Sequence, residues 1–87
     1  MEPREIFARN LASRRRDAGL SQEDLGFRSG VHRTEVSNLE TAKQEPRLST
    51  IIRLARGLGI PTTDLLTGVD DAELKPKRPR PRQGAAQ

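Results

Sequence analysis

The sequence contains no cysteine, tryptophan or tyrosine, and its 87 residues include only two phenylalanines. Without cysteine it can form neither a disulfide framework nor a thiolate metal site, a composition typical of proteins that work in a reducing cytosol. The first ten residues, MEPREIFARN, lack the apolar segment of a signal peptide, and no apolar run reaches membrane-spanning length. These absences predict a soluble, cytoplasmic protein.

Groups that carry catalysis are equally scarce. The chain has one histidine, His32, and no glycine-rich phosphate loop. A chain of this length forms one small domain with a thin core, which leaves little room for a pocket with converging titratable groups. A histidine without a cysteine or a second histidine does not make a zinc site. We therefore expect no enzymatic activity, no metal site and no cofactor.

The positive charge is concentrated at the C-terminal end. The whole chain has 16 basic and 12 acidic side chains, of which residues 1–70 hold 11 and 10 and residues 71–87 hold 5 and 2. The second segment alternates proline with lysine and arginine in KPKRPRPRQGAAQ and has no apolar periodicity. We expect residues 1–70 to form the folded domain and residues 71–87 a disordered basic tail, which either contacts a polyanion or only aids solubility.

Helix signals begin at the N-terminus. Residues 3–18 should form a first helix, with Phe7, Leu11 and Ala18 along its packed side and Gly19 as its end. No segment alternates apolar and polar residues as a strand does. The sequence therefore predicts an all-α fold, in which four further short helices follow the first.

The next two helices are joined by a glycine turn. Ser21 as N-cap, with Asp24 three residues later, predicts a short second helix whose main core residue is Leu25. Gly30 can adopt the left-handed conformation that a tight turn needs. Residues 31–40, VHRTEVSNLE, should then form the third helix.

The sequence signals for the last two predicted helices differ in strength. The fourth has the clearest helical spacing in the chain, with apolar residues at Leu48, Ile51, Leu54, Ala55 and Leu58. The fifth lies in PTTDLLTG, where Pro61 marks the start and Gly68 the end.

The third helix has an unusual polar side. At 100° per residue, one side carries Val36, Leu39, His32 and Glu40, and the other carries Thr34, Ser37, Asn38 and Thr41, with Arg33 and Glu35 on the flanks. Threonine, serine and asparagine are mediocre helix formers, so an ordinary solvated surface does not favour them. The polar side is either such a solvated surface or one that binds a partner.

Two short helices with a tight glycine turn between them make a helix-turn-helix, whose second helix enters the major groove of DNA. The segments GLSQEDL (19–25), SGVHRTEVSNLE (29–40), PRLSTIIRLARGLGI (46–60) and DLLTG (64–68) resemble, in this order, the Cro and phage-repressor-like regulators, also called the xenobiotic-response-element family. The family's motif positions are occupied by Gln22, Leu25, Gly30, Val36 and Leu39. The resemblance implies a lambda-repressor-like domain that binds double-stranded DNA, as a homodimer on a palindromic operator, and acts as a repressor or a restriction-modification controller.

The resemblance also implies roles for single positions. Base edges should be contacted by Arg33, Thr34 and Asn38, and the DNA backbone by Gln22, Ser37, Lys43 and Arg47. The side-chain chemistry agrees, because arginine pairs bidentately with guanine, asparagine pairs with adenine, and threonine donates to a base or packs on the thymine methyl.

Similar proteins use five further positions for structure and assembly. Arg15 and Glu40 should form a largely buried ion pair between the first and third helices, and the dimer interface should involve Ile60, Leu65 and Leu66.

Two non-catalytic alternatives use the same fold: an antitoxin whose tail folds around a toxin, and an adaptor that binds protein instead of DNA.

The chain departs from the family pattern at four places. Gly26 stands where alanine is usual, which should weaken the second helix, and TAK at 41–43 replaces Arg-Gly-Lys. Glu35 often corresponds to tyrosine; a carboxylate there is repelled by DNA unless it accepts from cytosine or is held by Arg28 or Arg33. Phe27 should cover the third helix or a partner protein.

Overall fold

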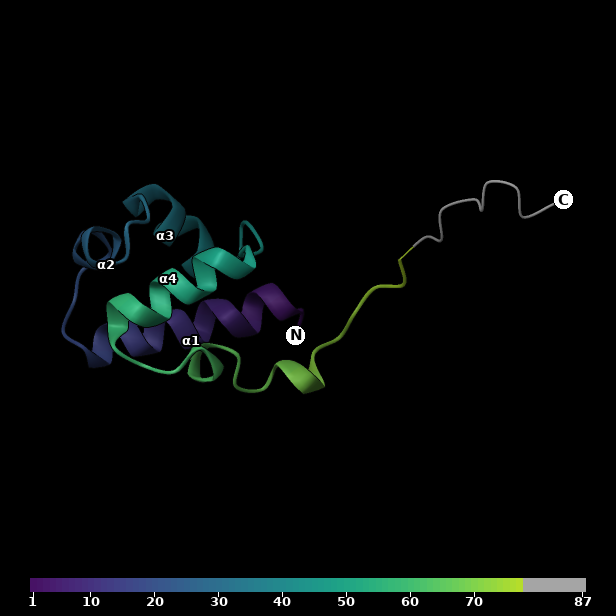
Figure 1. Cartoon of the computed structure of the whole chain (residues 1–87). Coiled ribbons are helices and arrows are strands. Elements are labelled where there is room, and N and C mark those ends of the chain that lie inside the picture. The colour runs from purple at the N-terminus through teal and green to yellow at the C-terminus, as the bar shows by residue number, and fades with distance from the viewer. Residues whose placement is uncertain (78–87) are drawn as a thin grey trace, which may run out of the picture.

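The structure is a computed structural model that describes residues 1–77; residues 78–87, which make up most of the predicted tail, lie outside the described part. Residues 1–77 contain helices and no strand, as predicted (Figure 1). The elements are α1 (Pro3–Asp17), α2 (Gln22–Ser29), α3 (Arg33–Glu40), α4 (Leu48–Leu58) and two short 3₁₀ helices, η1 (Thr62–Leu65) and η2 (Val69–Asp71). None of the described helices is both long enough and apolar enough to cross a membrane.

Helix α1 starts with a side-chain cap and ends before a glycine. The side chain of Glu5 accepts the backbone N–H of Glu2 at 2.8 Å. The helix ends at Asp17, one residue earlier than predicted, and Gly19 follows with a φ of +71°. Ala18 is exposed and forms the C-cap, so its expected place on the packed side of α1 was wrong.

The predicted capping box is present at the start of α2. Asp24 N donates to Ser21 Oγ at 2.9 Å, and Ser21 N donates to Asp24 Oδ2 at 3.1 Å. The hydrogen bonds from the backbone and the hydroxyl of Ser21 hold the pKa of the Asp24 carboxyl below its ordinary value. Gly30 ends the helix with a φ of +73°, which is the left-handed conformation that the turn to α3 requires.

Helix α3 is two residues shorter at its start than predicted. It begins at Arg33, because His32 has extended backbone angles and acts as the N-cap. The Nδ1 atom of His32 accepts the backbone N–H of Thr34 at 3.0 Å, and the imidazole is exposed. The expectation that His32 shares the packed side of the third helix was therefore wrong.

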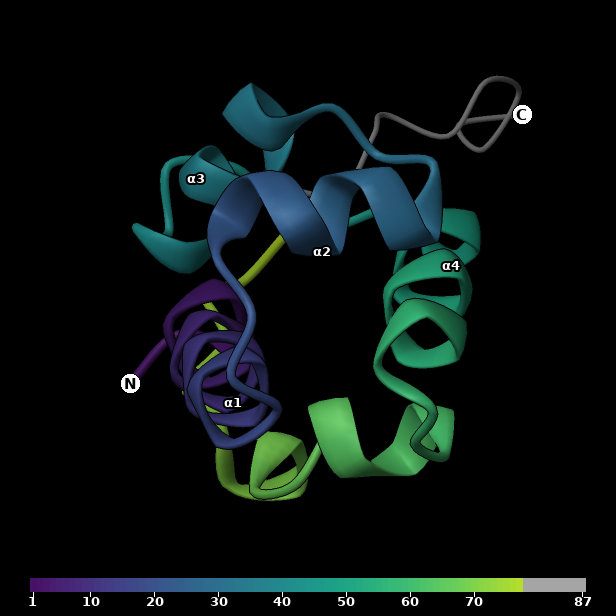
Figure 2. The ribbon, with the colours of Figure 1, turned by 90° about the vertical axis from the view of Figure 1, so that its left-hand side faces the viewer.

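One hydrophobic core joins all four α-helices and η1. Figure 2 shows α1, α2, α4 and η1 around the space that the core side chains fill. The buried residues of this core are Phe7, Leu11, Leu25, Val31, Val36, Leu39, Ile51, Leu54, Ala55 and Leu65. Leu48, the first residue of the periodic pattern in α4, is 70% exposed, so the pattern overestimates the buried side of that helix by one position.

Two helical glycines allow neighbouring backbones to approach closely. A Cβ atom at Gly26 would lie 2.5 Å from the carbonyl oxygen of Val31, and one at Gly57 would lie 2.9 Å from the Cβ of Ser29. The first contact is between α2 and the turn to α3, and the second is between α4 and α2. These glycines therefore fix how α2 packs on both neighbours.

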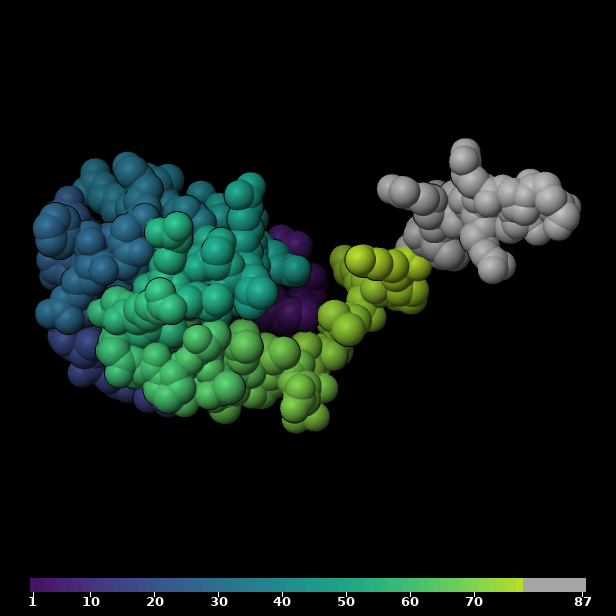
Figure 3. Space-filling model, in the orientation of Figure 1, coloured from purple at the N-terminus to yellow at the C-terminus, as the bar shows by residue number. Residues whose placement is uncertain are grey.

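The predicted fifth helix is present as η1, a 3₁₀ helix of four residues with one buried side chain, Leu65. The side-chain amide of Asn10 in α1 donates to the carbonyl oxygens of Leu65 and Thr67, at 3.0 and 2.9 Å, and ties this segment to α1. Further along, Glu73 N donates to the carbonyl oxygen of Met1 at 2.9 Å. Residues 74–77 are exposed and lead away from the packed part of the molecule (Figure 3).

Candidate nucleic-acid interface

Helix α3 lies at an outer edge of the molecule (Figure 1). Only Val36 and Leu39 of this helix are buried. Val36 and Leu39 have no exposed surface. On the opposite side, Thr34 is exposed, and Ser37 and Asn38 are half-buried. A short helix that is anchored by two apolar residues thus presents hydrogen-bonding groups to solvent.

Arg33 stands at the first turn of α3 with its side chain 67% exposed. Its Nη1 atom lies 3.5 Å from Glu23 Oε2 in α2, and the Glu23 side chain is also exposed. An exposed ion pair at this distance contributes little to stability, so the guanidinium is free to leave Glu23 for another acceptor.

A groove runs between α3 and the start of α4. It is lined by His32, Thr34, Glu35, Asn38, Gln44, Glu45, Arg47, Ser49, Thr50 and Arg53. Two of the predicted base-contacting residues and the predicted backbone contact Arg47 therefore share one depression of the surface. The groove also contains Arg53, which was not predicted from the sequence. Residues four apart lie on the same side of a helix, so the spacing of Arg53 from Ser49 could have indicated it.

The carboxylate of Glu35 is partly withdrawn from this surface. Glu35 is half-buried, and its Oε2 accepts from Thr50 Oγ1 of α4 at 3.5 Å. Within residues 1–77 no ion pair joins it to Arg28 or Arg33, the two arginines that the sequence offered as ways to hold this carboxylate. The hydroxyl of a neighbouring helix takes their place.

Three helices meet at the carboxylate of Glu40, whose side chain is 5% exposed. Arg15 of α1 donates to it through Nε and Nη2, at 2.6 and 3.0 Å, and Gln22 of α2 donates to it through Nε2 at 3.0 Å. The hydrogen bond to Glu40 raises the pKa of the Arg15 guanidinium, against the opposing effect of burial. The predicted ion pair thus exists, and it also fixes the amide of Gln22 at the start of α2.

Two predicted backbone-contacting cations flank the loop between α3 and α4. Lys43 is exposed, and its backbone N–H donates to the carbonyl oxygen of Asn38 at 2.9 Å. Ala42 before it has a φ of +59°, the one non-glycine residue among 1–77 with a positive φ. Arg47 is exposed at the N-cap of α4. The tight turn holds Lys43 close to the C-terminal end of α3.

The residues predicted for a dimer interface divide into two groups. Leu65 is fully buried in the core of this chain, whereas Ile60 and Leu66 are only partly buried and pack at the edge of the core. Phe27 is 91% exposed on α2, because Leu25, Gly26 and Ser29 occupy the buried side of that helix. The expectation that Phe27 covers the third helix was therefore wrong.

The arrangement suits binding and offers little for a metal. Among residues 1–77, histidine and acidic side chains nowhere form a group of three that could hold a metal ion. Every buried side-chain nitrogen and oxygen of this part has a hydrogen-bond partner. Any side-chain hydrogen-bonding group of this part that is free to meet a partner therefore lies at the surface.

Comparison with known proteins points to one family. A helix-turn-helix family model matches residues 11–65. The uncharacterized HTH-type transcriptional regulator y4dJ of Sinorhizobium fredii is 35% identical over 71 residues, which are 82% of this chain and 92% of the relative. Control protein C.SmaI of Serratia marcescens is 42% identical over 67 residues, which are 77% of this chain and 80% of the relative.

A solved structure supports the same assignment. The restriction-modification controller protein C.AhdI from Aeromonas hydrophila superposes with a TM-score of 0.70 at 35% identity, and the match covers 71% of this chain and 94% of that protein. The resemblance that the sequence suggested is thereby confirmed. The relatives are regulators rather than enzymes, and the chain belongs to the helix-turn-helix family of DNA-binding transcriptional regulators.

Proposed function

We propose that this chain is a sequence-specific regulator of the controller or repressor type that binds a palindromic operator as a homodimer. Helix α3 would lie in the major groove with its polar side on the base edges. The observation that carries the proposal is the division of α3, where Val36 and Leu39 are fully buried and the opposite side is polar and accessible.

Three residues of α3 are proposed to contact bases. Arg33 would pair with guanine, because its guanidinium is exposed and only loosely held by Glu23. Thr34, one residue further, would donate to a base or pack on a thymine methyl. Asn38 would pair with adenine; its Nδ2 atom has only a 3.5 Å contact, to Gln44, to give up.

Four further residues are proposed to hold the DNA backbone. Gln22 and Ser37 would contact phosphates beside α3, and Lys43 and Arg47 would contact them from the loop. The bond of Gln22 to Glu40 uses one of its two amide N–H groups, which leaves the other for a phosphate. Such contacts fix the register of the protein on DNA and supply most of the salt dependence of binding.

Dimer formation follows from the small reach of one helix. A single α3 reads only a few base pairs, so useful specificity needs two half-sites about one helical turn, or about 34 Å, apart. The proposed interface uses the accessible parts of Ile60 and Leu66, with Leu65 supporting them from the core.

The biological process is proposed from the relatives. Similarity to C.SmaI and to C.AhdI favours a controller of restriction-modification genes over a phage-type repressor. An adaptor that binds protein with this surface has less support, because Glu35, the residue that suggested it, accepts a hydrogen bond from Thr50 instead of standing free. The antitoxin alternative depends on the tail and on a neighbouring toxin gene.

Selection from a pool of random duplexes tests the proposal directly. The full chain should enrich an inverted repeat with half-site centres about 10 base pairs apart, and sedimentation should give two chains per enriched duplex. Enrichment of no sequence would refute the proposal. An enriched single half-site with one bound chain would refute only the dimer.

A further inference from the structure

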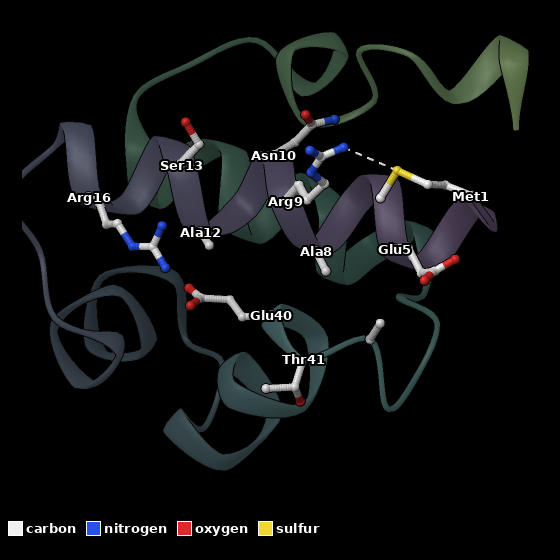
Figure 4. Close-up of a pocket in the computed structure, with 11 residues that line it drawn as sticks. Met1, Glu5, Ala8, Arg9, Asn10, Ala12, Ser13, Arg16, Glu40 and Thr41 are labelled. Carbon is white, nitrogen blue, oxygen red and sulfur yellow. Dashed lines mark hydrogen bonds between the residues drawn. The ribbon is translucent and has the colours of Figure 1, made fainter.

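A second groove lies beside the polar side of α3, between α1 and the end of α3 (Figure 4). Its lining includes Thr41, which directly follows α3, and Glu40. Thr41 is exposed and belongs to the same polar side as Thr34 and Asn38. The groove is thus continuous with the proposed reading surface, and none of the roles assigned above uses it.

Small side chains form the floor of this groove. Ala8 and Ala12 are buried side chains of α1 that face α3 in Figure 4, and Ala42 lines the groove from the loop. Methyl groups in these places leave room for a ligand to approach the backbone of α1. They also offer no acceptor that would repel an anion.

The charged side chains around the groove favour an anion. Arg9 and Arg16 line it, and within residues 1–77 neither forms an ion pair. Arg9 Nη1 donates to the sulfur of Met1 at 3.1 Å (Figure 4), and a thioether is only a weak acceptor. Figure 4 shows Arg16 directed toward Glu40. The carboxylate of Glu40 already accepts three hydrogen bonds, two of them from Arg15, which neutralises its charge.

One acidic group remains at the far end of the groove. The side chain of Glu5 lines it there and accepts the N–H of Glu2 in the helix cap. The charged amino group of Met1 lies at the same end, with only a 3.5 Å contact to Glu73. The cations therefore outnumber the free carboxylates along the groove.

We propose that this α1 groove binds the DNA backbone just outside the half-site that α3 reads, with Arg9 and Arg16 as phosphate contacts. The two arginines are seven residues apart, which is about 10 Å along a helix and matches the axial rise of about three nucleotides on one strand. The inference rests on the proposed placement of α3 in the major groove, because that placement brings the flanking phosphates to the neighbouring α1.

The experiment compares the full chain with Arg9→Gln, Arg16→Gln and a matched control, Arg56→Gln. Arg56 is an exposed arginine in the last turn of α4. The groove between α3 and α4 lies at the other end of this helix, where α4 begins. Affinity is measured across a salt series on the selected duplex and on a scrambled duplex. Thermal melts check that all four proteins are folded.

Each groove variant should bind both duplexes more weakly and should reduce the salt slope by about 0.9 per chain. When the salt concentration rises from about 50 to about 200 mM, each variant should therefore lose about threefold less affinity than the unmodified chain does. Arg56→Gln should leave the slope unchanged. Ethylation of phosphates that flank the half-site should interfere with binding of the unmodified chain and no longer interfere with Arg16→Gln.

The inference would be overturned if the salt slopes of Arg9→Gln and Arg16→Gln equalled the slope of Arg56→Gln. It would also be overturned if Arg16→Gln left the ethylation pattern unchanged. Failure of the proposed function has a different signature: the unmodified chain would bind the selected and the scrambled duplex equally well. Competition by inorganic phosphate beyond its effect on ionic strength would indicate a small-anion site and would also overturn the assignment to DNA.

Discussion

A methyl group at position 26 would lie 2.5 Å from the carbonyl oxygen of Val31 and 3.3 Å from the backbone nitrogen of Arg33. Helix propensity alone predicts that Gly26→Ala stabilises α2 by about 1 kcal/mol. Both close atoms belong to the backbone and cannot move aside, so we expect Gly26→Ala to destabilise the protein by about 1 to 3 kcal/mol instead. Urea unfolding measures the sign, and a more stable variant would contradict the contact.

Ala42 offers the opposite case, because its φ of +59° is unfavourable for a residue with a Cβ atom. Ala42→Gly should stabilise the protein by about 1 kcal/mol by removing the left-handed strain. Ala72→Gly is the matched control: Ala72 has a φ of −67°, where glycine only adds entropy to the unfolded chain and should destabilise slightly. Melting temperatures that shift in the same direction for both variants would show that strain at Ala42 is unimportant.

Predictions from the sequence succeeded at single residues where chemistry and spacing act locally. Ser21 and Asp24 could be paired from a capping pattern, and Gly30 from its position between two helices. The exposure of Phe27 and the Thr50 contact of Glu35 could not be predicted, because they depend on which neighbour each helix surface meets in three dimensions. The sequence contains no local signal for that choice.

At the scale of helices, the carboxylate of Glu40 joins α1, α2 and α3. Removing it in Glu40→Ala leaves the partly buried Arg15 without its partner and should lower the free energy of unfolding by about 3 kcal/mol. Replacing both residues with apolar side chains, Arg15→Met and Glu40→Leu, should recover much of the loss, because no charge is then left unpaired. Denaturant unfolding of the three proteins tests this. An undisturbed Glu40→Ala, or a double variant weaker than the single one, would contradict a structural role.

The order of the helices could be predicted from the sequence, but two details of their ends could not. Helix α3 starts later than its apolar residues suggest, because His32 caps it instead of continuing it. The fifth helix is only a 3₁₀ helix of four residues, and Leu65 is its single buried side chain. Both differences concern backbone angles, which the spacing of apolar residues does not specify.

At the scale of the whole molecule, we expect the basic tail to raise affinity for every duplex and α3 to supply sequence specificity. Residues 1–70 have almost balanced charge, and residues 75–87 contain five cations and no acid. Removal of residues 75–87 should weaken binding to every duplex by a similar factor and flatten the dependence of affinity on salt, because these cations can meet only phosphate. Binding of the truncated chain to selected and scrambled duplexes across a salt series measures both effects. Unchanged affinity for both would leave the tail without a role in DNA binding.

Base reading by α3 is the central claim, and the variant Arg33→Ala tests it most directly. Its affinity should be measured on the selected duplex and on a scrambled duplex at the same salt concentration. We expect a loss of about 1 to 3 kcal/mol per half-site on the selected duplex and little change on the scrambled one, because a bidentate contact to guanine exists only in the first complex. An equal loss on both duplexes would make Arg33 a phosphate contact and would contradict the assignment of α3.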